Sequence, residues 1–140
     1  MSAMLTKILL ADDDLDDRWF FEDFLKDRED ILLLPAATSG SEIIQYLDNL
    51  ASENELPDVI ILDHNMPGLN GKETLALLRS RDRYNQISVL IYSTYISQRL
   101  IDDCMKLGAA SVMLKPSSPE EYNGMIDRIL SDAAKKESNY

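Results

Sequence analysis

Five short apolar runs, separated by longer amphipathic segments, constrain the fold of this chain more than any other feature of its sequence. The central runs are almost wholly apolar instead of alternating, as in parallel strands that are covered on both faces. We therefore expect five strands that build one buried sheet. They lie at KILLA (7–11), ILLLP (31–35), DVIILD (58–63), ISVLIYS (87–93) and SVMLK (111–115).

The segments between these runs have the period of amphipathic helices. We expect Ser39 with Glu42, and Ser118 with Glu121, to form capping boxes that begin two of the helices. Gly108 is expected to end the fourth helix. The residues expected to face the sheet are Phe20, Phe21, Phe24, Leu25, Ile43, Ile44, Leu47, Leu75, Leu78, Leu100, Ile101, Cys104, Tyr122, Met125, Ile126 and Ile129.

The order of elements, strand then helix repeated five times, predicts an α/β fold. Right-handed crossovers give a doubly wound five-stranded parallel sheet with helices on both faces, and hence three layers. This (βα)5 order is that of flavodoxin-like folds, in which function lies at the carboxyl ends of the strands. The 140 residues suit a single domain. We place its core at about 5–132 and expect the polar tail, 133–140, to fray.

The charge and the cysteine content exclude several classes of partner and setting. The chain carries a formal charge of −11, which repels nucleic acids and anionic membranes and suits cations or basic protein surfaces. Cys104 is the only cysteine, so no internal disulfide forms. The N-terminus lacks a secretory signal, and no apolar stretch approaches the ~20 residues of a membrane helix, so a cytoplasmic location is expected.

Polar residues stand at the ends of four of the expected strands. Because the carboxyl ends of parallel strands lie along one edge of a sheet, we expect these residues to meet there. They are Asp12 and Asp13, Asp63, Ser93 and Thr94, and Lys115.

Three carboxylates at a half-buried edge require compensating positive charge. A pair of like charges ~4 Å apart costs about 4 kcal/mol at an effective dielectric of roughly 20. Lys115 supplies one charge, and Mg²⁺ is expected to supply the rest because it takes oxygen ligands. A set without His or Cys argues against zinc. Asp14, Asp16 and Asp17 have a simpler interpretation, as cap and first-turn residues that favour the dipole of the first helix.

Two other kinds of site share parts of this acidic pattern. Asp12-x-Asp14-x-Asp16 resembles the start of an EF-hand loop, but the sixth position is Asp17 instead of Gly and the twelfth is Asp23 instead of Glu. The stretch ILLADDD also resembles the DxD signature of haloacid dehalogenase-type phosphatases. In that signature the position of Asp16 is usually Thr or Val, and the chain is short for that fold.

Taken together, the motifs at the strand ends resemble the receiver domain of two-component response regulators over roughly residues 5–132. The resemblance rests on ILLADDD, IILDHNMPGLNG, the serine of VLIYST and the Lys-Pro of VMLKPSS. The string D-x-x-M-P-x-x-x-G, from Asp63 to Gly71, is quite specific. It implies a switch that accepts a phosphoryl group from a sensor histidine kinase or a phosphotransfer protein.

The resemblance implies that Asp63 is the phosphoacceptor. It implies that Asp13 and Asp63 bind Mg²⁺ directly and that Asp12 acts mainly through coordinated water. The backbone carbonyl of Asn65 matches the third protein ligand of the metal.

The resemblance also implies partners for the phosphoryl oxygens. Lys115 would pair with them, and the Ser93 hydroxyl and the backbone N–H of Thr94 would donate hydrogen bonds to them. A cis peptide before Pro116 would aim Lys115 into the site.

One position departs from the family pattern. Receivers often carry an aromatic residue three positions before the lysine, where this chain has Val112. Tyr92 or Tyr95 is a candidate substitute. We expect Asn65 and Tyr95 to tune dephosphorylation by controlling the access of water, and His64 to be a solvent-facing spacer.

The chain ends soon after the fifth helix, so we expect a stand-alone switch that is not an enzyme beyond its own phosphorylation and dephosphorylation. Output would pass through protein–protein contact, over roughly residues 96–132, or through a phosphorelay. No nucleic acid or membrane partner is expected. Two alternatives stay open: a receiver-like interaction module that is never phosphorylated, and a DxD-type phosphohydrolase with Asp12 as its nucleophile.

Overall fold

The computed structural model describes residues 5–138, with side chains as far as residue 134. Strands and helices alternate along the chain, as the apolar runs predict, and a short 3-10 turn, Glu53–Glu55, precedes β3. The elements are β1 (Thr6–Ala11), α1 (Leu15–Leu25), β2 (Ile31–Leu33), α2 (Gly40–Asp48), β3 (Val59–Asp63), α3 (Gly71–Arg79), β4 (Ser88–Ser93), α4 (Gln98–Lys106), β5 (Ser111–Leu114) and α5 (Pro119–Ser138).

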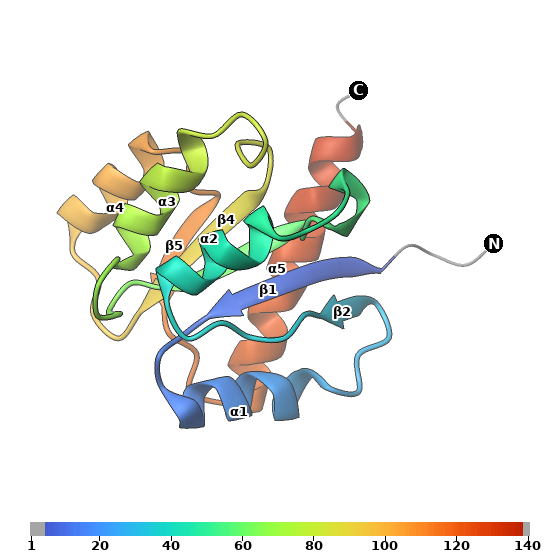
Figure 1. Ribbon diagram of the computed structural model, residues 1–140. Coiled ribbons are helices and arrows are strands. Elements are labelled where there is room, and N and C mark those ends of the chain that lie inside the picture. Colours follow the sequence, from blue (N-terminus) through green and yellow to red (C-terminus); the bar gives the residue numbers. More distant parts are fainter. Residues whose placement is uncertain (1–4, 139–140) are drawn as a thin grey trace.

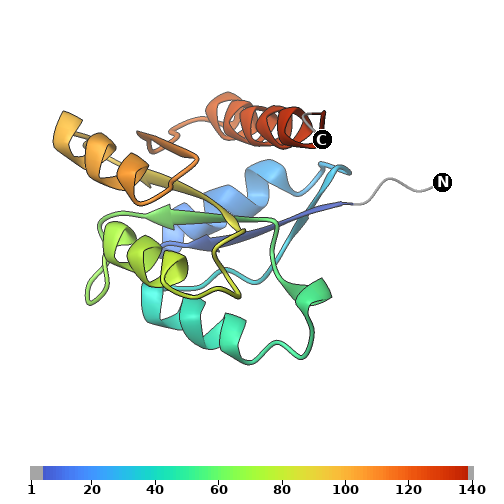
Figure 2. The ribbon, with the colours of Figure 1, turned by 90° about the horizontal axis from the view of Figure 1, so that it is seen from above.

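The five strands form one parallel sheet in the order β2-β1-β3-β4-β5 (Figure 1). Helices α1 and α5 cover one face, and α2 and α3 cover the other (Figure 2). This is the doubly wound, three-layered flavodoxin-like arrangement predicted from the order of apolar runs. None of the helices described over residues 5–138 is long and apolar enough to cross a bilayer.

Burial on both faces explains why the central strands are apolar throughout. Successive residues of β3 point to opposite sides, so Ile60 packs with α2, α3 and α4, whereas Ile61 packs with α1 and α5. Both side chains are fully buried. Each contributes roughly 1.5–3 kcal/mol to folding, and an alternating polar strand here would lose that on one face.

The order of the strands determines what meets at the edge of the sheet. Strand β3 lies between β1 and β4, with Leu62 paired to Ala11 and Asp63 paired to Tyr92. The residues that follow β1 therefore lie beside the end of β3. Since β5 pairs with β4, Lys115 reaches the same edge from the other side, and its backbone N–H donates to Ser93 O at 2.8 Å.

The helix starts agree with the sequence in position but differ in detail. Ser39 caps α2 by accepting from the backbone N–H of Glu42, yet the Glu42 carboxylate accepts from Thr38 and not from Ser39. Glu121 of α5 likewise accepts from the residue before the cap, Ser117. The predicted reciprocal boxes are therefore wrong at these two helices, because the residue before each cap offers the glutamate two donors, its backbone N–H and its side-chain hydroxyl. A reciprocal box that was not predicted from the sequence, Asn70 with Glu73, begins α3.

Other departures concern the surface of the helices. Phe20 is partly exposed and stacks on Phe24 at 5.5 Å, while Phe21 and Leu25 form the buried stripe of α1. Helix α5 continues through 133–138, part of the tail that we expected to fray, and residues 139–140 lie outside the described part of the chain. Gly108 ends α4 with a φ of 94°, as predicted.

One tight contact between α2 and α3 yields a test of the packing. A Cβ at Gly40 would lie 2.0 Å from Oγ1 of the fully buried Thr74. We expect Gly40→Ala to lower the free energy of unfolding by about 1–3 kcal/mol in chemical denaturation, because the added methyl overpacks this contact. In a Thr74→Ala background the cost should shrink. Gly124→Ala, where a Cβ meets open space, serves as the control and should not destabilise.

Candidate functional site

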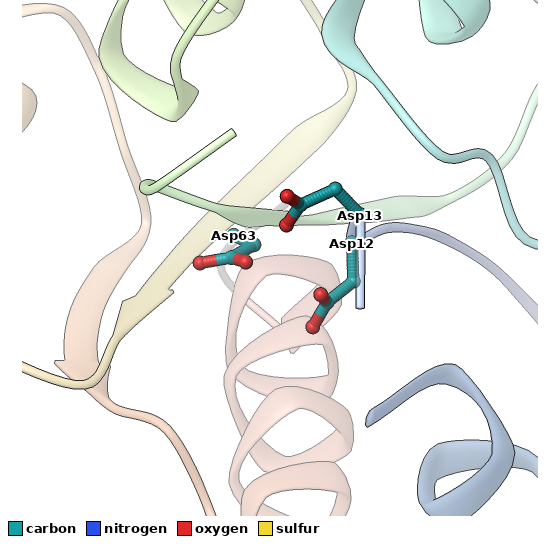
Figure 3. A group of neighbouring side chains, drawn as sticks. All are labelled: Asp12, Asp13 and Asp63. Carbon is teal, nitrogen blue, oxygen red and sulfur yellow. The ribbon is translucent and has the colours of Figure 1, made fainter. Parts of the chain in front are cut away.

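Three carboxylates gather where β1 and β3 end (Figure 3). Asp12 directly follows β1 and Asp63 is the last residue of β3, while Asp13 is exposed at the rim. One oxygen from each lies within 4.8 Å of the others. Asp12 is fully buried and Asp63 is 3% exposed. The sequence prediction that these three residues converge is therefore confirmed in its geometry.

Lys115 provides the positive charge of the site. Its Nζ lies 3.3 Å from Asp63 Oδ2, 3.2 Å from Asp12 Oδ2 and 2.7 Å from Asp17 Oδ2. Burial alone would lower the pKa of Lys115, but the hydrogen bond to Asp17 and the charges of Asp12 and Asp63 outweigh it and raise the pKa above its ordinary value. The ammonium is thus held in its charged form beside Asp63.

The pKa of Asp63 lies well above that of an ordinary aspartate. Burial and the negative charge of Asp12 raise the pKa of Asp63 to about 7, against the favourable charge and hydrogen bond of Lys115 and a hydrogen bond from the backbone N–H of Asn65. The charge of Lys115 therefore does not offset burial and the charge of Asp12, and further positive charge beside Asp63 would favour its ionised form.

Two residues of the site make contacts that the sequence did not predict. Asp17 lies in the first turn of α1, as predicted, and its carboxylate also accepts a hydrogen bond from Lys115. The Asp14 side chain does cap α1, as predicted, by accepting from the Asp17 backbone N–H. Tyr92 is fully buried, and its hydroxyl donates to Asp12 Oδ2 at 2.6 Å. The only indication of this contact in the sequence was a tyrosine immediately before the serine at the end of the strand.

The Ser93 hydroxyl lies beside the acceptor loop. Ser93 is 1% exposed, and its Oγ accepts from the Asn65 side-chain amide at 3.0 Å. The Asn65 backbone N–H donates to Asp63 Oδ1 at 3.2 Å. Thr94 and Tyr95 follow in an exposed segment, with Tyr95 75% exposed. Asn65 thus links the acceptor to the strand-four hydroxyl.

The proposed aim of Lys115 through a cis peptide is wrong. None of the peptide bonds described within residues 5–138 is cis, so the bond before Pro116 is trans. The pairing of the Lys115 backbone with Ser93 extends the register of β5 and β4, and this directs the side chain to the acidic edge without a change of peptide isomer.

Two smaller expectations also differ from the structure. His64 is half-buried instead of facing solvent, and burial lowers its pKa. Tyr92, a candidate for the missing aromatic, is enclosed between the sheet and α5 and is therefore not free to rotate. Val112, which stands at the usual position of that aromatic, packs against the core on the opposite face of the sheet.

The donor chemistry of the edge fits a hard divalent cation. Asp12, Asp13 and Asp63 offer oxygens only, within the span of one ion, and burial together with the negative charge of Asp12 raises the pKa of Asp63. Mg²⁺ and Mn²⁺ take carboxylate oxygens and water as ligands. The residues therefore fit the metal that the sequence predicts.

The family model "Response regulator receiver domain" matches residues 8–127. A protein-glutamate methylesterase/protein-glutamine glutaminase of Clostridium acetobutylicum is 31% identical over 127 residues. That alignment covers 89% of this chain but only 34% of the relative. The chain thus spans about a third of that protein.

Solved structures agree in fold. The chemotaxis response regulator CheY4 of Vibrio cholerae superposes with a TM-score of 0.76 at 25% identity, covering 90% of this chain and 99% of that one. The Mn²⁺-bound form of response regulator Rcp1 superposes with a TM-score of 0.74 at 24% identity, covering 90% of this chain and 92% of that one.

The raised pKa of Asp63 predicts how stability depends on pH. The unfolded chain releases the Asp63 proton near pH 3.8, whereas the folded metal-free protein holds it until about pH 7. Stability from this residue is therefore lost as pH rises between these values. In EDTA, Asp63→Asn should stabilise the protein by on the order of 1–3 kcal/mol more at pH 8 than at pH 4, measured by chemical denaturation. The exposed Asp82→Asn is the control; an equal gain in both variants would contradict the prediction.

Proposed function

Because the chain belongs to the response regulator receiver domain family, we propose that it is a signalling switch that accepts a phosphoryl group on Asp63. The observation that carries this proposal is the position of the Asp63 carboxylate, which lies between two further acids and the Lys115 ammonium. Phosphoryl transfer depends mostly on positioning and on neutralising charge, and this arrangement supplies both.

The proposed reaction joins Asp63 to phosphorus. A carboxylate oxygen of Asp63 forms a bond to the phosphorus of a phosphohistidine on the partner, and the phosphorus–nitrogen bond breaks. The leaving imidazole keeps the electron pair of that bond. The product is an acyl phosphate on Asp63. The Lys115 ammonium, 3.3 Å from Asp63 Oδ2, is placed to pair with the oxygens of the transferred group.

A divalent cation completes the proposed site. Asp13 and Asp63 would bind it directly, Asp12 would act mainly through coordinated water, and the Asn65 backbone carbonyl would be a further ligand. When bound, Mg²⁺ would neutralise charge on the transferred group. The name of the Rcp1 structure reports Mn²⁺ in a protein of the same fold, which supports this choice of metal.

The switch itself is proposed to act through Ser93. Its hydroxyl now accepts from the Asn65 amide, and donation to a phosphoryl oxygen on Asp63 would draw it toward the acceptor. The Thr94 backbone N–H would donate to another oxygen. A local charge added at Asp63 thereby changes the conformation of the segment after β4.

The proposed partners are proteins. A sensor histidine kinase or a phosphotransfer protein would donate the phosphoryl group, and a protein target or a phosphorelay would receive the signal. The formal charge of −11 does not favour a nucleic acid or an anionic membrane surface. We propose a cytoplasmic setting and no enzymatic activity beyond the chain's own phosphorylation and dephosphorylation.

The two alternatives make different demands on the acids. A DxD-type phosphohydrolase needs Asp12 as its nucleophile, but Asp12 is fully buried and both of its oxygens already accept hydrogen bonds. A module that is never phosphorylated does not need Asp12, Asp13, Asp63, Ser93 and Lys115 together. Both observations favour Asp63 as the acceptor.

Incubation with acetyl phosphate and Mg²⁺ tests the proposal. Intact-mass spectrometry should show the labile gain of one phosphoryl group, which Asp63→Asn and EDTA each abolish, while the exposed Asp82→Asn retains it. Sustained hydrolysis of a small phosphate ester that survives Asp63→Asn but not Asp12→Asn would support the phosphohydrolase instead. No mass gain in the presence of Mg²⁺ would support the unphosphorylated module.

The exposed ring of Tyr95 makes the lifetime of the acyl phosphate testable. The Tyr95 backbone N–H approaches Ser93 Oγ at 3.4 Å, which places this residue beside the site. We expect Tyr95→Ala to increase the rate of phosphoryl loss several-fold, because water reaches Asp63 more easily. Leu77→Ala, which truncates an exposed side chain on α3, is the control. Equal decay in the Tyr95 variant and the wild type, followed by intact mass, would contradict this role.

A further inference from the structure

Tyr92 is a buried tyrosine whose hydroxyl is committed to one carboxylate of the site. The residue is fully buried, and its hydroxyl donates to Asp12 Oδ2 at 2.6 Å. Hydrogen bonds of this length to an acceptor that bears charge are among the stronger ones in proteins. Neither the acceptor role of Asp63 nor the metal set itself requires a tyrosine at this position.

The same side chain also lies against the positive charge. Lys115 Nζ is 5.1 Å from the centre of the Tyr92 ring and 3.2 Å from Asp12 Oδ2. Asp12 Oδ2 therefore accepts from the hydroxyl while it pairs with the ammonium. The ring and hydroxyl of Tyr92 thus contact the two charged groups that flank Asp63.

Backbone pairing places Tyr92 beside the acceptor. Tyr92 is the residue of β4 that pairs with Asp63, and its carbonyl accepts from the His64 backbone N–H at 2.9 Å. Side chains alternate along β4, so Tyr92 faces α1 and α5 and the following Ser93 points to the other side. One strand thus supplies a polar group on each side of Asp63.

From these contacts we infer that Tyr92 is a positioning residue of the metal site, which holds the Asp12 carboxylate in the orientation that a divalent cation needs. The inference rests on the proposed function, because the ion is the one that Asp12, Asp13 and Asp63 would share. Asp12 Oδ1 is fixed by the Asp14 backbone N–H at 2.9 Å, and Oδ2 is fixed by Tyr92. Together the two donors prevent rotation of the carboxylate.

The need for such a donor follows from burial. Asp12 has no exposed surface, so bulk water cannot replace a lost hydrogen bond. A phenylalanine at position 92 would keep the ring against Lys115 and remove only the donor to Oδ2. Outer partners that orient metal ligands typically contribute about 10- to 100-fold to metal affinity.

The test measures metal binding without phosphorylation. Titration of the unphosphorylated protein with Mn²⁺, followed by the paramagnetic resonance signal of the free ion, should show about ten-fold weaker binding for Tyr92→Phe than for the wild type. Tyr84→Phe is the matched control, because Tyr84 is equally buried and its hydroxyl donates to Asp48 at 2.5 Å, on a different part of the molecule. That variant should bind Mn²⁺ like the wild type.

A double-mutant cycle separates positioning from a general effect on the fold. If Tyr92 acts through Asp12, the Tyr92→Phe change should have little further effect on Mn²⁺ affinity in an Asp12→Asn background. Melting of each variant in EDTA confirms that it is folded during the titration. Unchanged or tighter Mn²⁺ binding in Tyr92→Phe, or an equal loss in both backgrounds, overturns the inference. Failure of the wild-type protein to bind Mn²⁺ overturns the metal site of the proposed function as well.

Discussion

The Lys115 ammonium, held among the carboxylates of Asp12, Asp17 and Asp63, is the interaction on which the rest of the site depends. Removal of the lysine would leave two of these acids almost wholly buried with their charges unpaired, which is the costly way to break such a cluster. The sheet order makes the cluster unavoidable. Strand β3 lies between β1 and β4, and β5 pairs with β4, so residues more than a hundred positions apart end at one edge. The negative charge that remains in excess is what a divalent cation can neutralise.

Much of the fold could be predicted because the relevant signals are local and periodic. A continuous apolar run such as that of β3 is compatible with few environments, and the alternation of such runs with helical periods leaves few topologies. The convergence of Asp12, Asp13, Asp63 and Lys115 followed from a general property of parallel sheets, that carboxyl ends share an edge. Nothing about individual side-chain conformations was needed for that step.

Contacts that depend on the direction of a side chain could not be predicted from the sequence. In the sequence, Asp17 looks like any acidic residue in the first turn of a helix. It belongs to the site only because the Lys115 side chain extends far enough along the edge of the sheet to donate to its carboxylate. Tyr92 looks in the sequence like any buried strand residue, and its hydroxyl matters because the neighbouring Asp12 is fully buried and has no access to water. The capping glutamates show the same limit. Their spacing was informative, but the choice between Ser39 and Thr38 as partner depends on rotamers that spacing does not encode.

The sheet is bordered by its two shortest strands, β2 with three residues and β5 with four. A border strand carries peptide groups that face away from the sheet, and long flat borders serve as templates on which other chains add as extra strands. Borders this short present few such groups, and the surplus of negative charge keeps copies of the chain apart. Few peptide groups are therefore open to an added strand, and both properties disfavour polymerisation of the folded chain through its sheet borders.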